Sequence, residues 1–311
     1  MKKHFILGAC AVLGGLLTAC QDDAVAPVAG ETVDVTFTAA LPAEMASRSF
    51  GDGTTAKNLS YAVYEAGDAS KALITGEVKN AFDAELKANL TLKLAKGKAY
   101  DLVFFADAED APYVFTASNA QVSCNYTVDA LANKESRDAF FASRLNLVIN
   151  DDARETITLR RPTAQVNIGA ADYAAAEKAG FKVAKSSVVV TSTYSTLNLL
   201  NGSVTGANAM SATMNTIPAD TEVFPVANVD VDYVSMNYLM VAADKDLVTV
   251  EATFESEKGE TITRKFLNVP VQRNYRTNIY GNLLTQDADF TIVIEPTFQT
   301  PSNDEQRDFL S

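Results

Sequence analysis

Alternation of apolar and polar residues with a period of two is the feature that most restricts how this chain can fold. In the segment ETVDVTFTAALP, Val33, Val35 and Phe37 take every second position, and threonine or aspartate lies between them. Successive side chains of a β-strand point to opposite faces, so this pattern predicts a half-buried strand over residues 32–40. Similar short alternating segments recur along the chain with turn residues between them, which indicates β-sandwiches rather than parallel sheets.

Two longer segments are predicted to be β-hairpins. In residues 85–108, Leu90, Leu92 and Leu94 alternate before a turn at Gly97, and residues 100–105 return, whereas residues 247–271 alternate on both sides of Gly259. A glycine between two such runs is a strong turn signal, because glycine tolerates positive φ angles. Both segments are therefore expected to be antiparallel strand pairs.

Helix is scarce, and the strongest candidate is residues 172–180, with Asp172 as N-cap and a glycine just past the end. Such a short helix cannot form the outer layer of an α/β fold. We expect a signal peptide at residues 1–19 and a tether at 20–30. An N-terminal β-sandwich domain at 31–160 and a C-terminal one at 161–311 follow, with a hinge at Arg161-Pro162.

The first residues resemble a bacterial lipoprotein signal. Two lysines precede an apolar run from Phe5 to Ala19, which is too short to span a bilayer, since a spanning helix needs about 20 residues. The run ends in Leu-Thr-Ala-Cys, which resembles a lipobox with Cys20 as the lipidated residue. The resemblance implies cleavage before Cys20, acylation, and anchoring in the outer membrane at the cell surface. A plain signal peptide with an incidental cysteine is the alternative.

Composition excludes several classes of function. The single histidine is His4, inside the predicted signal, so histidine-based catalytic triads and metal sites are excluded from the mature chain. A net charge of −13 argues against nucleic acid as a partner. The acidic segments 107–110, 150–152 and 230–232 lack calcium-loop spacing and are expected to be solvated loops. We expect no enzyme activity, no cofactor and no metal.

Two further residues have structural interpretations. Cys124 is the remaining cysteine once Cys10 leaves with the signal and Cys20 is lipidated, so no intrachain disulfide is expected. Its alternating surroundings predict a buried thiol. Arg273 precedes a strand and is expected to cap backbone carbonyl groups at a domain corner rather than to bind ligand.

Several segments, in their order, resemble the fimbrillin superfamily of Bacteroides-type bacteria, the lipoprotein precursors of type V pili and related surface proteins. After the lipobox, the segments that carry the resemblance are SRSFGDG, LSYAVYEA, LVFFADAEDAPY, ESRDAFF, RRPTAQVNI, LNLLNGSVTG and VPVQRNYRTNIYG. The resemblance covers most of residues 17–296. It implies an all-β fold with two transthyretin-like β-sandwich domains and Greek-key-type antiparallel sheets.

The resemblance also implies a mechanism of assembly. In members that polymerise, an arginine-specific protease cuts the loop after the first strand, that strand is lost, and a C-terminal segment of the next subunit fills the groove. The matching cleavage site here is Arg48-Ser49. The displaced strand would contain Val33, Val35 and Phe37, and the candidate donor is residues 288–296, where Phe290, Ile292 and Ile294 alternate with less apolar residues.

The sequence is also compatible with other interpretations of the cleavage site and of the donor segment. Arg48 could be an ordinary exposed loop arginine, and residues 288–296 could be the final strand of their own domain. At the level of function, a structural or accessory pilus subunit that supports adhesion is expected, with other subunits or copies of itself as partners. The alternative is a surface lipoprotein that binds glycan or host protein without polymerising.

Overall fold

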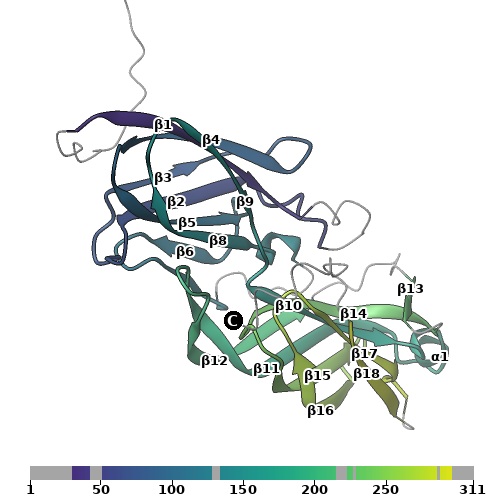
Figure 1. Cartoon of the computed structure of the whole chain (residues 1–311). Helices are drawn as coiled ribbons and strands as arrows, with labels where there is room; N and C mark the ends of the chain where they lie inside the picture. Colours follow the sequence, from purple (N-terminus) through teal and green to yellow (C-terminus); the bar gives the residue numbers. More distant parts are fainter. Residues whose placement is uncertain are drawn as a thin grey trace, which may run out of the picture.

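The computed structural model describes residues 30–42, 51–127, 134–214, 223–226, 229–285 and 288–295. Figure 1 shows two stacked layers of strands at the N-terminal end, in purple to teal, and a second pair of layers in green to yellow. The prediction of an all-β protein with little helix is confirmed. No helix among the described residues is both long and apolar enough to cross a membrane.

Two sheets form the N-terminal sandwich. One has three strands in the order β4-β1-β9, and the other has four in the order β3-β2-β5-β8. Alternate apolar residues of both sheets face each other and form one core cluster. The strands are β1 (Thr32–Ala40), β2 (Asn58–Glu65), β3 (Ile74–Val78), β4 (Lys87–Ala95), β5 (Ala99–Asp107), β8 (Phe140–Val148) and β9 (Ala153–Thr158).

Two larger sheets form the C-terminal sandwich. One follows the order β16-β15-β11-β7-β6, with β12 paired to β11, and the other follows β13-β14-β10-β17-β18. The strands are β6 (Tyr113–Thr116), β7 (Gln121–Cys124), β10 (Thr163–Ala170), β11 (Val183–Asn198), β12 (Val204–Met214), β13 (Val223–Val226), β14 (Val229–Met240), β15 (Asp246–Ser256), β16 (Thr261–Val271), β17 (Arg276–Asn282) and β18 (Asp289–Glu295).

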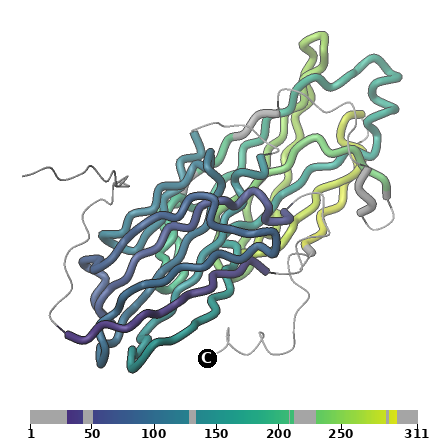
Figure 2. The backbone as a smooth tube through the Cα atoms, turned by 90° about the horizontal axis from the view of Figure 1, so that it is seen from above, coloured from purple at the N-terminus to yellow at the C-terminus, as the bar shows by residue number. Residues whose placement is uncertain are grey.

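The β6–β7 hairpin connects the two sandwiches. It pairs with β11 of the C-terminal sandwich, although it precedes residue 160 in the chain. Its apolar residues pack against the face of the β2–β5 sheet that points away from the N-terminal core. Strand β5 is therefore buried on both faces, which explains its continuous apolar run. Figure 2 shows the strands of the two halves lying alongside one another.

The predicted hairpin over residues 85–108 is wrong. β4 pairs with β1, whereas β5 pairs with β2 and β8 in the opposite sheet. Gly97 has a positive φ, as expected for a turn, but its backbone N–H donates to the carbonyl of Ile149 instead of closing a hairpin. The turn therefore carries the chain from one sheet to the other across the end of the sandwich.

Several other local predictions are confirmed. β15 and β16 form the predicted antiparallel hairpin around Gly259. The predicted helix is present as α1 (Tyr173–Lys178), and Gly180 follows it with φ of 98°. Asp172 lies at the N-cap, but its side chain makes no capping bond. It instead accepts hydrogen bonds from the backbone N–H groups of residues 283–285.

Two parallel strand pairs depart from the expectation of purely antiparallel sheets. β1 runs parallel to β9, and β10 runs parallel to β17. In each pair, the two partners are separated by more than 100 residues, so the pairing needs the rest of the sandwich to be in place. Period-two alternation does not report strand direction, which is why the sequence could not predict these pairs.

Cys124 is buried with 6 % exposure, as predicted. Burial raises the pKa of its thiol to about 12, so the reactive thiolate is scarce at neutral pH. We expect the native protein to resist alkylation by iodoacetamide until it is unfolded. Mass spectrometry of native and denatured samples checks this, and rapid labelling of the native protein would contradict it.

Candidate functional site

Strand β1 lies in the middle of its sheet and, in the part of the chain that the structure describes, is the strand that joins β4 to β9. It pairs with β4 over nine residue pairs and with β9 over six. Among the described residues, neither β4 nor β9 has another strand partner in this sheet. Removal of β1 would therefore leave a slot one strand wide between two unpaired edges, which we call the β1 slot.

The inward face of β1 is buried from Val35 to Ala39. Val35 and Phe37 have no exposed surface, and Ala39 is 1 % exposed. Val33, the remaining predicted residue, is partly buried and packs at the margin of the same core. Phe37 also contacts the ring of Phe104 in the opposite sheet, with 5.7 Å between ring centroids. The predicted orientation of the strand is thus confirmed, and sequence reasoning missed only the burial of Ala39.

The outward face of β1 carries a row of polar contacts to β4. The Lys93 ammonium group lies 2.8 Å from the Asp34 carboxylate. The hydroxyl groups of Thr36 and Thr91 are 2.9 Å apart, and the Thr38 hydroxyl donates to Asn89 at 2.7 Å. Sequence reasoning did not identify Asn89, Thr91 and Lys93, although their alternation with Leu90, Leu92 and Leu94 could have placed them on the outer face.

The candidate donor segment forms β18 at the edge of its own sheet, so the structure shows the alternative left open by the sequence. Within the described residues it pairs along one side, with β17, over seven residue pairs. Ile292 packs against the C-terminal core, and Phe290 contacts Phe266 but remains 42 % exposed. β18 is therefore held by fewer contacts than β1.

The remaining predicted site residues lie outside the described part of the chain. They are Cys20, at the predicted lipidation site, and Arg48 and Ser49, at the predicted cleavage site. The described chain resumes at Gly51, two residues after Ser49.

Gly51 is bound on both sides by charged groups, the partly buried Glu135 and the buried Arg161. The Glu135 carboxylate accepts a hydrogen bond from its N–H at 2.8 Å, and the Arg161 guanidinium donates to its carbonyl. Arg161 also forms a two-pronged ion pair with Asp138, with both N–O distances at 2.7 Å. Arg161 is 1 % exposed and Asp138 is fully buried, so the ion pair holds the predicted hinge position in place.

The same cluster reaches the C-terminal sandwich. The Tyr238 hydroxyl donates to Glu135 at 3.0 Å and accepts from the Gln165 amide at 3.1 Å, and Gln165 in turn accepts from Arg276 at 2.7 Å. The hydrogen bonds thus run from the segment that follows β1 to β17, the neighbour of β18. Sequence reasoning missed this cluster, because its members are scattered over more than 200 residues.

Burial raises the pKa of the Glu135 carboxyl to about 6, from an ordinary value of 4.5. Because the folded state then binds this proton more tightly than the unfolded state, stability rises as the pH falls from about 7 to 4.5. A shift of this size corresponds to about 2 kcal/mol. We expect Glu135→Gln to flatten the pH dependence of unfolding in this range. Denaturant titrations at pH 5 and 7.5 check this, and an unchanged pH dependence in the variant would contradict it.

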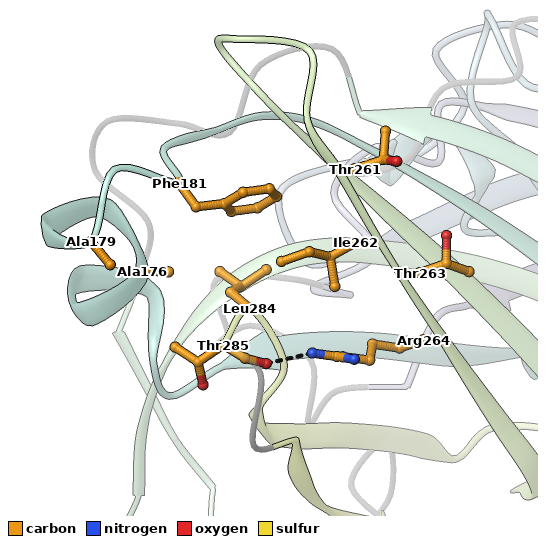
Figure 3. Close-up of a pocket in the computed structure, with 9 residues that line it drawn as sticks. All are labelled: Ala176, Ala179, Phe181, Thr261, Ile262, Thr263, Arg264, Leu284 and Thr285. Carbon is orange, nitrogen blue, oxygen red and sulfur yellow. Dashed lines mark hydrogen bonds between the residues drawn. The ribbon is translucent and has the colours of Figure 1, made fainter.

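Two concave regions lie away from the β1 slot. A groove of about 580 Å³ next to α1 is lined mainly by small and apolar side chains, including Phe181, Ile262 and Leu284 (Figure 3). The guanidinium of Arg264, its one charged lining group, already donates to the carbonyls of Leu283 and Thr285. This groove therefore offers an apolar surface without a charged group directed at a ligand.

The second hollow, of about 420 Å³, is lined by polar residues of β2, β3 and β5 and by residues of β6. Burial and the nearby Glu77 raise the pKa of Asp107 in this hollow to about 7. Among the described residues, no group of three or more histidine, cysteine, aspartate or glutamate side chains is arranged to hold a metal ion. Arg273 donates to the carbonyls of Gly202 and Val241, which confirms its predicted capping role.

Comparison with known proteins provides a family and a fold. Residues 27–310 match the model of a family of unknown function, DUF6562. A search of curated proteins finds no matching sequence. A structure of a candidate polysaccharide-binding protein from Bacteroides thetaiotaomicron is similar, with a TM-score of 0.55 and 13 % identity, over 88 % of this chain and 99 % of that chain.

Two candidate adhesins have similar structures. The protein from Bacteroides ovatus has a TM-score of 0.51 at 12 % identity, over 84 % of this chain and 94 % of that one. The protein from Bacteroides thetaiotaomicron has a TM-score of 0.54 at 11 % identity, over 85 % and 97 %. At such identities the similarity concerns the fold. At that level, the predicted all-β sandwich fold is the one that these Bacteroides proteins share with this chain.

Proposed function

Because the chain belongs to this family of unknown function and has the fold of candidate Bacteroides adhesins, we propose that it is a fimbrillin-like cell-surface lipoprotein. It acts as a structural or accessory pilus subunit and supports adhesion, without catalytic activity. Its partners are other pilus subunits or copies of itself. Lipidated Cys20 anchors the precursor in the outer membrane.

The observation that carries the proposal is the central position of β1 in a three-stranded sheet. A cut after Arg48 separates β1 from the rest of the chain, and loss of β1 exposes two strand edges together with the pockets of Val35, Phe37 and Ala39. Unpaired edges of this kind accept a strand with matching alternation from another chain. The weakly held edge strand β18, with alternating Phe290, Ile292 and Ile294, supports the choice of donor.

A second function is favoured by one comparison. The similar structure from Bacteroides thetaiotaomicron is named as a candidate polysaccharide-binding protein, so a non-polymerising lipoprotein that binds glycan or host protein is the alternative. The two functions differ in mechanism, because only the pilus-subunit function requires β1 to be removed from its sheet.

Mass spectrometry of the N-terminus of the protein on cells separates these functions. Polymerisation predicts that SDS-resistant assemblies contain chains that begin at Ser49. A chain that always begins at acylated Cys20 would contradict the proposed assembly and favour the surface binder.

Lipid anchoring has its own test. Cys20→Ala is expected to abolish incorporation of a fatty-acid probe, because no other residue at the predicted signal boundary can form the thioether. Cys124→Ala is the matched control and should leave labelling unchanged. Undiminished labelling of Cys20→Ala would overturn the lipobox assignment.

A further inference from the structure

The β1 slot has a polar wall as well as apolar pockets. Lys93, Thr91 and Asn89 all project from the exposed face of β4, and they lie directly opposite Asp34, Thr36 and Thr38 in the strand register. Each pair is in contact, through an ion pair or a hydrogen bond. Any strand that replaces β1 must therefore present side chains to a lysine, a hydroxyl group and an amide, in that order.

The sequence of β18 matches the first two positions of this order, whereas its third outward residue, Val293, falls opposite Asn89. β1 reads Asp34-Val-Thr-Phe-Thr-Ala-Ala40, and β18 reads Asp289-Phe-Thr-Ile-Val-Ile-Glu295. β18 and residues 34–40 of β1 both start with an aspartate, continue with an apolar residue and a threonine, and then place a second apolar residue. When the two aspartates are superimposed, Phe290, Ile292 and Ile294 fall on the inward positions of β1.

We infer that β18 of a second copy of this chain enters the β1 slot in the direction of β1, with Asp289 beside Lys93 and Thr291 beside Thr91. Lys93 and Thr91 are then the residues that set the register of assembly. This inference rests on the proposed strand exchange and adds to it the identity of the partner, its direction and its alignment.

Packing and backbone geometry favour this direction over the reverse one. A donor that runs as β1 does is antiparallel to β4 and parallel to β9, so it reproduces the native hydrogen bonding on both sides. The reversed strand would place Phe290 in the space of Ala39, which is 1 % exposed. The native direction places Ile294 there, and a smaller side chain causes less overpacking.

Engineered cysteine pairs test the register. The variant Thr91→Cys/Thr291→Cys places two thiols opposite each other across copies in the inferred alignment. Its matched control, Asn89→Cys/Thr291→Cys, does so if the donor strand is reversed with Phe290 at the position of Ala39, or is shifted by two residues in the same direction. In one subunit β4 and β18 belong to different sheets, so a disulfide reports contact between copies.

The experiment uses the chain from Gln21, treated with an arginine-specific protease and analysed on denaturing gels with and without reductant. The first variant is expected to give about tenfold more reductant-sensitive oligomer than the control, because a disulfide needs Cα atoms within about 7 Å. More linkage in the control, or none in either variant while the unmodified chain forms SDS-resistant ladders, would overturn the register and leave the proposed function intact. Absence of ladders from the unmodified chain would overturn both.

A charge exchange tests the role of Lys93 separately. The Lys93–Asp34 pair is well exposed, so its replacement should have a modest effect on assembly, about two- to fivefold. Lys93→Glu is expected to reduce the assembled fraction by this factor, and addition of Asp289→Lys is expected to restore it. Lys71→Glu, at an exposed loop lysine outside β4, is the control. A reduction that Asp289→Lys does not reverse would overturn the assigned role of Lys93.

Discussion

Replacement of Phe37 by alanine is expected to lower the free energy of unfolding of the N-terminal sandwich by about 3–5 kcal/mol. The ring has no exposed surface, contacts Phe104 and lies at the centre of the core between the two sheets. Its removal leaves a cavity that the surrounding strands cannot fully close. Because small domains are usually stable by only about 5–15 kcal/mol, this is a large part of the total.

Denaturant titration followed by circular dichroism measures the effect, since the chain has no tryptophan for fluorescence. Thr36→Ala is the matched control on the same strand. Its side chain lies on the outer face and loses one hydroxyl contact, worth about 0.2–1 kcal/mol. Equal effects of the two substitutions would contradict the burial of β1 described above.

The second large effect is expected at the buried ion pair. Arg161→Ala should destabilise the protein by about 3–5 kcal/mol, because it leaves the fully buried Asp138 carboxylate without its cation. It also removes the donor to Gly51 and the guanidinium that lies 4.8 Å above the Phe140 ring.

The double variant Arg161→Met/Asp138→Leu separates the charge from the packing. Apolar side chains of similar size avoid an unpaired buried charge, so this variant should recover most of the lost stability. Hydrogen exchange of residues 51–56 provides a second measurement, because these residues should lose protection in Arg161→Ala. Retained stability in Arg161→Ala would show that the ion pair does not hold the junction.

Local features of the fold could be predicted from the sequence because they depend on neighbouring residues. Alternation located β1 and the β15–β16 hairpin, and Gly180 marked the end of α1. The β4–β5 connection was misjudged because a glycine turn between two strands looks the same whether it joins one sheet or two. Only pairing with distant strands distinguishes the two arrangements.

The candidate site could be predicted only in part for the same reason. The inward face of β1 follows from its own pattern, whereas its central position depends on β9, more than 100 residues later in the chain. The Glu135–Asp138–Arg161 cluster has no local signature, since a charged residue normally indicates an exposed position. Its burial is a property of the junction between the sandwiches.

The central claim is that β1 can leave and that a strand of a neighbouring subunit replaces it. The most direct measurement compares the size, at increasing concentration, of chains that begin at Gln21 and at Ser49, by light scattering after gel filtration. The chain from Gln21 should stay monomeric, and the chain from Ser49 should form SDS-resistant assemblies. Phe290→Asp/Ile292→Asp should prevent assembly, because buried unpaired charge is costly. A chain from Ser49 that is stable and monomeric at high concentration would contradict the account.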